Sequence, residues 1–308
     1  MVPHAISGPE STGSVRDLQS EAQYYVRKMT INITNASSLG PLDTPEKADE
    51  LVALWDDFYE VIAFTTLDSE LEREILEDPA IIKIMPDIRR ILGESEVALE
   101  KTWADRVVAV KDPSEARKIF VSTPLHEFYE HVVKAEWSAM LSILGRTPTS
   151  VAILGSGAMP ETGIWITDWA QKNGQQVHIY SLELFPDRLE QGRKVYDALT
   201  GSKHCTFEAG DVRTTPQDLS AHDIVYFNAA VGTTTLEKET IILDVVKRMR
   251  VGAYMITRST HSLKTMAYPP AQIQTPRVFK KLRPVQTCHL NGERGKNASA
   301  SFIISRVV

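Results

Sequence analysis

Two glycines separated by one residue follow an apolar stretch and could bring the backbone close to a ligand. Residues 151–157, Val-Ala-Ile-Leu-Gly-Ser-Gly, read as a buried strand that runs into a turn, and a helix is expected to follow. Gly155 and Gly157 permit a sharp turn around Ser156, and the free N–H groups at the start of the helix can donate to a polar or anionic group. Because the third glycine of the dinucleotide fingerprint is missing, an ordinary strand-to-helix turn fits this motif equally well.

Polar residues also follow three later apolar stretches, at 177–183, 205–209 and 222–228. A carboxylate about twenty residues beyond the glycine turn can accept both ribose hydroxyls of a nucleoside, and one at the next strand end could accept the adenine amine, although it could equally cap a turn. In an open parallel sheet these ends share one edge. No second phosphate-binding loop follows, so the spacing favours S-adenosylmethionine (SAM) over a dinucleotide. The candidates are Glu183, Asp211, Asn228 and Ala229.

The composition indicates a cytoplasmic enzyme that acts on a small molecule. The 308 residues include 34 basic and 40 acidic ones, and this net charge of −6 argues against nucleic acid and anionic membranes as partners. Apolar runs are too short to span a bilayer, and residues 1–10 lack the features of a secretory signal. Cys205 and Cys288 are too few for a disulfide framework, and no Cys/His cluster has metal-ligand spacing, so no metal is expected. A homodimer is compatible with this composition.

The elements before the glycine turn read as helices. Residues 1–15 are rich in Ser, Gly and Pro and are expected to be a disordered tail, followed by a helical cap domain over 16–147. Thr44 can cap a helix that begins at Pro45 and runs to Phe64. Further helices are expected at 69–76, 80–92 and 95–110, and Pro86 should kink or split the second of these three.

A short polar linker, residues 146–150, separates this part from a pattern of alternating strands and helices. That alternation indicates an α/β fold with a doubly wound parallel sheet. We therefore expect a Rossmann-like SAM-binding domain over residues 148–308, preceded by the all-helical domain.

Several segments carry a family resemblance. The loop Gly155-Ser-Gly-Ala-Met-Pro-Glu-Thr162 resembles the G-S-G-P-L-P-L-T loop of nicotianamine synthases, and Asn228-Ala-Ala-Val-Gly232 resembles their A-A-L-V-G strand end. Residues 257–269 are similar to the family's L-R-S-A-H-A-L-R-x-x-L-Y-P, 128–136 to N-Y-x-x-L-x-K-L-E and 94–100 to E-A-E-G-L-L-E. Together with a last strand at 297–305, these collinear segments identify the chain as a member of the nicotianamine synthase-like superfamily.

The resemblance implies unusual SAM chemistry. SAM would be a substrate whose 3-amino-3-carboxypropyl arm is cleaved from sulfur, with release of methylthioadenosine, inside a chamber closed by the helical domain. Ala158, Met159, Glu161 and Phe128 replace family residues where the chamber should be lined, which favours cyclisation of the arm to azetidine-2-carboxylate. Three alternatives stay open: transfer of the arm to an amine as in nicotianamine synthase, conventional methyl transfer, and SAM binding without turnover.

Candidate roles follow from the same resemblance. Tyr129 matches the family's site tyrosine and could orient or deprotonate the attacking amine, or be a core residue. Glu96 and Glu100 share one helical face, and one of them matches an acid that serves as the base; a solvated helix face is the alternative. Phe128, Tyr129, Trp165 and Tyr226 could line the site with their rings. Each could instead be a core residue, which is the preferred interpretation for Trp165 on its helix. Arg258 could hold the SAM carboxylate with two parallel hydrogen bonds, or form a salt bridge under the sheet edge.

Overall fold

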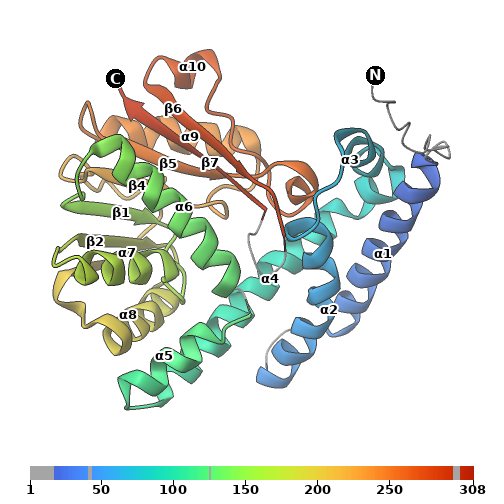
Figure 1. Ribbon diagram of the computed structural model, residues 1–308, viewed down its shortest axis with the longest axis horizontal. Coiled ribbons are helices and arrows are strands. Elements are labelled where there is room, and N and C mark those ends of the chain that lie inside the picture. The colour runs from blue at the N-terminus through green and yellow to red at the C-terminus, as the bar shows by residue number, and fades with distance from the viewer. Residues whose placement is uncertain (1–16, 41–43, 125, 294–298) are drawn as a thin grey trace, which may run out of the picture.

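The computed structural model describes residues 17–40, 44–124, 126–293 and 299–308. A mixed α/β part and a helical part lie side by side, and the long helix α4 runs between them (Figure 1). The expected disordered tail, residues 1–15, lies outside the described residues.

A seven-stranded sheet with the order β3-β2-β1-β4-β5-β7-β6 forms the centre of the α/β part. The first five strands in this order are parallel to their neighbours, as predicted, whereas β7 is antiparallel to both β5 and β6. The fold class is therefore confirmed, and the antiparallel end is an addition that the sequence pattern did not indicate. The strands are β1 (Ser150–Leu154), β2 (His178–Glu183), β3 (Cys205–Ala209), β4 (Ile224–Phe227), β5 (Tyr254–Ser259), β6 (Leu282–Leu290) and β7 (Ala300–Val307).

Both faces of this sheet are covered. Along β1, Val151 and Ile153 belong to one hydrophobic cluster, whereas Ala152 and Leu154 belong to another, because successive side chains of a strand point to opposite faces. The first cluster is completed by helices α6 (His126–Leu144), α7 (Glu161–Lys172) and α8 (Pro186–Thr200), and the second by α9 (Thr235–Arg248). Burial on both faces explains why the central strands read as continuous apolar runs.

The helical part contains α1 (Leu18–Ser38), α2 (Pro45–Ala63), α3 (Ser69–Leu76), the long α4 (Pro79–Ala109) and the short α5 (Pro113–Val121). Thr44 caps α2 as predicted, since its side chain accepts a hydrogen bond from the backbone N–H of Lys47 at 3.3 Å. Asp68 caps α3 in the same way, with the N–H of Leu71 at 2.9 Å.

Helix α4 differs from the prediction, because the segments expected at 80–92 and 95–110 form one helix of 31 residues. Pro86 does not split it. A proline inside a helix removes a backbone hydrogen bond and costs about 3 kcal/mol. Ile81, Ile88, Ile91 and Leu99 are nevertheless buried on this helix, and their packing holds it together across the proline.

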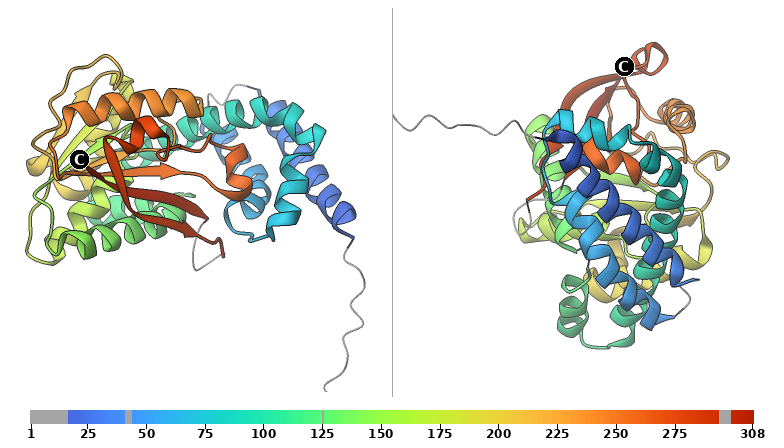
Figure 2. Two further views of the ribbon diagram at one scale, coloured as in Figure 1. Left: turned by 90° about the horizontal axis from the view of Figure 1, so that it is seen from above. Right: turned by 90° about the vertical axis from the view of Figure 1, so that its right-hand side faces the viewer.

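Two cores meet along α4. Its first half packs with α1, α2 and α3 and with Leu263, Met266 and Ala267, which belong to or follow the short helix η2 (Ser262–Met266). Its second half packs with α5 and α6 against the sheet. The views in Figure 2 show the helical part lying beyond one end of the sheet. The division into domains near residue 147 stays a prediction.

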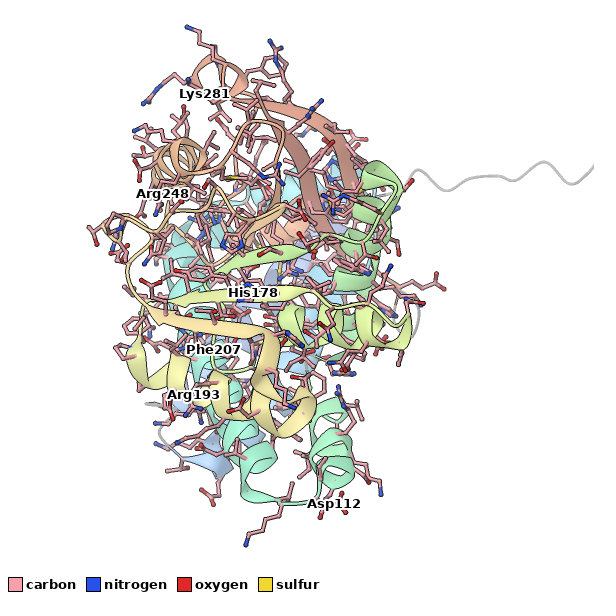
Figure 3. All side chains as sticks on the ribbon, turned by 90° about the vertical axis from the view of Figure 1, so that its left-hand side faces the viewer. Asp112, His178, Arg193, Phe207, Arg248 and Lys281 are labelled. Atoms are coloured by element: carbon pink, nitrogen blue, oxygen red, sulfur yellow. The ribbon has the colours of Figure 1, made fainter. Side chains whose placement is uncertain are left out.

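The orientation of the strands decides which end of the sheet meets the helices. His178, the first residue of β2, lies on the side drawn in Figure 3, which is the side away from the helical part. Because β1 to β5 are parallel, their carboxyl ends all lie on the other side, toward α4.

Candidate active site

A cavity of about 530 Å³ lies at the carboxyl ends of the parallel strands, between the sheet and helices α4 and α6. Its volume falls in the range of small-molecule sites. Its walls include the glycine turn after β1, the ends of β2, β4 and β5, residues from α4 and α6, and part of η2.

The glycine turn requires both of its glycines. Gly155 and Gly157 have φ angles of 79° and 73°, in the region that L side chains rarely adopt. A Cβ atom at Gly157 would also lie 2.6 Å from Oε2 of Glu100, and one at Gly155 would lie 2.9 Å from a methyl of Val231. Ser156, between the two glycines, is buried and lines the cavity.

Glu183 lies at the end of β2, beside this turn. Its Oε2 accepts a hydrogen bond from the backbone N–H of Gly157 at 2.9 Å, and its Oε1 accepts one from the N–H of Phe185 at 3.3 Å. Arg188 adds a cation, with Nη1 at 3.7 Å from Oε1. Two backbone N–H groups and a nearby guanidinium therefore hold the Glu183 carboxylate at the cavity wall.

Asp211 and Asn228 line the same cavity. Both carboxylate oxygens of Asp211 accept hydrogen bonds from the guanidinium of Arg213, at 2.7 to 3.0 Å. The amide nitrogen of Asn228 donates to the carbonyl of Gly155 at 2.8 Å, and its Oδ1 is buried without a hydrogen-bond partner in the described chain. Asn228 thus fixes the backbone of the glycine turn from β4.

Lys238 was not identified from the sequence, yet it organises the loop that contains Ala229. Its ammonium donates to the carbonyl of Ala229 and, at 3.0 Å, to that of Val231. Burial lowers the pKa of Lys238 to about 8. No local sequence signal distinguishes this lysine from the exposed Lys247 of the same helix.

Arg258 at the end of β5 is already paired. Its Nε and Nη2 donate to the two oxygens of Glu136 at 2.8 and 2.7 Å, and Nη2 also donates to Thr162 at 2.9 Å. The guanidinium and the carboxylate are both buried. Two nitrogens of the guanidinium that was expected to hold a substrate carboxylate therefore bind Glu136 of α6. A role for Arg258 in binding the carboxylate of SAM stays a prediction.

Glu96 and Glu100 both line the cavity, so neither belongs to a solvated helix face. Burial raises the pKa of Glu96 to about 7, against the opposing effect of its hydrogen bond with Tyr268. The Tyr268 hydroxyl donates to Oε2 of Glu96, and the Tyr59 hydroxyl donates to Oε1 at 3.4 Å. This environment produces a carboxyl group whose pKa lies close to neutral pH.

Glu100 has different partners. Its Oε2 accepts hydrogen bonds from Arg188 Nη2 at 2.8 Å and from the backbone N–H of Ala158 at 3.1 Å. Burial raises the pKa of this carboxyl, and Arg188 opposes the rise. Glu100 therefore connects α4 to the glycine turn.

Tyr129 projects from α6 into the cavity wall, and its hydroxyl makes no hydrogen bond to any residue that the structure describes. Burial, together with Glu96 and Glu100, raises the pKa of Tyr129 well above its usual value. The phenol therefore stays protonated near neutral pH, which suits orienting an amine and not deprotonating it.

The other aromatic candidates divide into two groups. Phe128 lines the cavity, and its ring centroid lies 3.6 Å from the ammonium of Lys264. Trp165 and Tyr226 are buried in the core of the sheet part and do not line this cavity. Trp165 stacks on Trp169 at 5.4 Å between centroids, which confirms the core assignment preferred for its helix.

The described residues lack both a metal-binding cluster and a membrane-spanning helix. In the resolved ranges, no three His, Cys, Asp or Glu side chains gather where they could hold a metal ion. Of the helices in the described parts of the chain, none is long and apolar enough to cross a membrane.

Known proteins resemble the chain over nearly its whole length. The family model described as "Nicotianamine synthase protein" matches residues 18–304. Nicotianamine synthase 3 of Oryza sativa subsp. indica is 24% identical over 268 residues, which are 84% of this chain and 74% of that protein. Nicotianamine synthase 2 of Arabidopsis thaliana is 26% identical over 217 residues, 70% of this chain and 66% of that protein.

Solved structures show the same fold. A glutamate-to-glutamine mutant of MtNAS in complex with S-adenosylmethionine superposes with a TM-score of 0.71 at 19% identity, covering 92% of this chain and 98% of that one. MtNAS in complex with MTA and tNA gives a TM-score of 0.73 at 18% identity, with the same coverage. These matches extend over both the helical part and the sheet.

Proposed function

Because the chain belongs to the nicotianamine synthase family, we propose that it transfers the 3-amino-3-carboxypropyl arm of SAM to an amine nitrogen and releases methylthioadenosine. The observation that carries this proposal is that Glu96, Glu100 and Tyr129 line one cavity with the carboxyl ends of the strands. Burial raises the pKa of Glu96 there to about 7. The names of the relatives and the SAM complex of MtNAS support it.

SAM would bind across the strand ends. The glycine turn would let SAM approach the backbone, Glu183 would accept from the ribose hydroxyls, and Asp211 would accept from the adenine amine. The helical part would then lie over the amino-acid arm, since Glu96 and Glu100 of α4 and Tyr129 of α6 line that side of the cavity.

The three carbons bonded to the sulfonium sulfur of SAM are all electrophilic, and the enzyme must direct the attack to one of them. In the proposed step an amine nitrogen attacks the γ-carbon of the arm, a C–N bond forms, and the C–S bond breaks with its electron pair going to sulfur. The sulfonium becomes the neutral thioether of methylthioadenosine, and the proton of the amine goes to a carboxylate. Only geometry can select this carbon, so the walls of the cavity must hold the arm in line with the nitrogen.

Glu96 suits the role of base better than Glu100. A general base is most effective when its pKa lies near the working pH, and burial raises the pKa of Glu96 to about 7. Glu100 is already engaged by Arg188 and by the N–H of Ala158. Tyr129, with a protonated hydroxyl free of described partners, would orient the amine.

Cyclisation of the arm to azetidine-2-carboxylate is the second candidate. This candidate is supported by three residues that line the cavity and differ from the family pattern, namely Met159 and Glu161 of the glycine loop and Phe128 of α6. The relatives matched here are named nicotianamine synthases, which makes intermolecular transfer the better supported of the two.

The nucleoside product tests the proposal against methyl transfer. Purified protein incubated with SAM should release methylthioadenosine, identified by mass spectrometry, and no S-adenosylhomocysteine. Release of S-adenosylhomocysteine would instead identify a methyltransferase built on the same type of sheet.

A further inference from the structure

Two cationic side chains of the cavity wall have no carboxylate at ion-pair distance among the described residues. Lys264, in η2, is buried and donates to the backbone carbonyl of Ser299 at 2.8 Å. Arg89, on α4, donates to the carbonyls of Met266 and Thr265 at 3.3 and 3.2 Å. Across the described ranges neither side chain forms an ion pair, whereas three other arginines of the cavity wall do, namely Arg188, Arg213 and Arg258.

The two cations approach the same side of the cavity, Arg89 from α4 and Lys264 from η2. Arg89 binds the carbonyls of the two residues that directly follow Lys264 in the chain. Glu96 lies about two turns after Arg89 on the same helix and interacts electrostatically with Lys264. Arg89 and Lys264 therefore mark the Glu96 side of the cavity.

A buried cation without a counter-ion is costly, and such groups in proteins are normally paired. The ammonium of Lys264 has three donors, of which the Ser299 carbonyl takes one, and the Phe128 ring centroid lies 3.6 Å away. The guanidinium of Arg89 has five donors, and the two backbone carbonyls take two. Donors therefore remain on both cations for an anionic ligand. Burial lowers the pKa of Lys264 to about 7, and the charge of Glu96 opposes this shift only in part.

We propose that Lys264 and Arg89 bind the carboxylate of an α-amino-acid group at the Glu96 side of the cavity. The proposal rests on the proposed function, because it is the arm transfer that brings amino-acid groups to this side. Arg258, the candidate from the sequence for such a carboxylate, already binds Glu136 through Nε and Nη2. Two sources share this chemistry: the carboxylate of the SAM arm itself, and the carboxylate of the amine that accepts the arm.

Binding measurements test the first source without any turnover. SAM, decarboxylated SAM and methylthioadenosine are titrated calorimetrically into the full-length protein. If Lys264 holds the arm carboxylate, Lys264→Met should weaken SAM about tenfold to a hundredfold, the range of a hydrogen bond to a charged group, and leave the other two ligands unchanged. Arg89→Met should act in the same direction.

Kinetics test the second source. L-2,4-diaminobutyrate and 1,3-diaminopropane differ only in a carboxylate, and each is offered as acceptor with saturating SAM. If the acceptor carboxylate binds Lys264, Lys264→Met should raise the KM for diaminobutyrate about tenfold or more and leave that for diaminopropane unchanged. Lys264→Arg keeps the charge and should retain the discrimination. Lys247→Met, which changes a lysine with a 71% exposed side chain, is the matched control.

The outcomes separate the two proposals. The carboxylate site is overturned if the wild-type protein binds the ligands with and without the carboxylate equally well in both comparisons. It is also overturned if the variants keep the wild-type ratios of affinity and of KM, or if they bind methylthioadenosine as weakly as they bind SAM. Carboxylate-dependent SAM binding without release of methylthioadenosine would refute the proposed function and leave this site standing. Release of methylthioadenosine, with variants that keep the wild-type ratios of affinity and of KM, would support the proposed function and refute the carboxylate site.

Discussion

Oε2 of Glu100 lies 3.1 Å from the backbone nitrogen of Ala158, so a carboxylate of the long helix α4 is bound directly to the glycine loop of the sheet. Arg188 of α8 binds the same oxygen at 2.8 Å. The helical part is therefore bound to the sheet part at the carboxyl ends of the strands. This arrangement places Glu96, one turn earlier on α4, above the space where an arm of SAM could lie.

The first prediction concerns Glu96 as the base. Because burial raises its pKa to about 7, kcat for release of methylthioadenosine should increase as pH rises through about 7. Glu96→Gln should lower kcat about 10²- to 10⁴-fold and abolish the increase of kcat with pH, while the affinity for SAM is retained. Glu94→Gln, at an exposed site that pairs only with Arg90 among the described residues, is the control. An unchanged kcat in Glu96→Gln would place the base elsewhere.

The same group makes a prediction for stability. The folded protein holds the Glu96 proton more tightly than the unfolded chain does, because its pKa is about 7 against a reference value of 4.5. This contribution is fully present below about pH 4.5 and is lost as pH rises through 7. The melting temperature of Glu96→Gln relative to wild type should therefore rise between pH 4.5 and 7, measured by thermal melts.

The second prediction concerns Tyr129. Its hydroxyl has no hydrogen-bond partner in the described chain, so Tyr129→Phe should change the melting temperature very little. If the hydroxyl orients the amine, kcat should fall by about tenfold, the worth of a single hydrogen bond. Tyr226→Phe removes another buried unpartnered hydroxyl that lies outside the cavity and should leave kcat unchanged. Equal activity of the two variants would remove Tyr129 from the mechanism.

The third prediction assigns Arg258 to stability. Its fork is filled by Glu136, and breaking a buried pair by removing one partner costs about 3–5 kcal/mol. Arg258→Met and Glu136→Gln should each lower the free energy of unfolding, and the double variant should lose much less than the sum. Denaturant unfolding of the four proteins measures this. If a variant of Arg258 had normal stability and a raised KM for SAM, Arg258 would be assigned to binding the substrate carboxylate instead.

The fourth prediction concerns the nucleoside end of the site. If Glu183 accepts from the ribose, Glu183→Ala should weaken SAM and methylthioadenosine alike by about 1–3 kcal/mol in calorimetric titrations. Glu208→Ala is a suitable control, since that glutamate of β3 binds Tyr180 at 2.8 Å and does not line the cavity. Unchanged affinities in Glu183→Ala would refute this placement of the nucleoside.

The sequence predicted one half of the site well. Glycines and polar residues at the ends of apolar strands, such as Gly157, Glu183 and Asn228, must lie at one edge once the strands are parallel, and the structure brings them together. Strand β6 was missed because most of its residues are exposed or half-buried, which leaves little apolar pattern to read.

The other half depends on pairs that are remote in the chain. Tyr268 donates a hydrogen bond to Glu96, which lies 172 residues earlier in the sequence. Arg258 binds Glu136, which lies 122 residues earlier. Local periodicity carries no information about such partners. It could show that Glu96 and Glu100 share a helical face, but not that this face is buried against the strand ends or that Lys264 lies nearby.

The most direct measurement of the central claim is a crossover experiment with SAM alone. The protein is given an equal mixture of SAM labelled with ¹⁵N in the amino group and SAM labelled with ¹³C throughout the arm, and the products are separated and weighed by mass spectrometry. Transfer between molecules predicts methylthioadenosine and a linear product in which the ¹⁵N of one arm is bonded to the ¹³C of another. Azetidine-2-carboxylate that carries either label but never both, with no mixed product, would contradict intermolecular transfer.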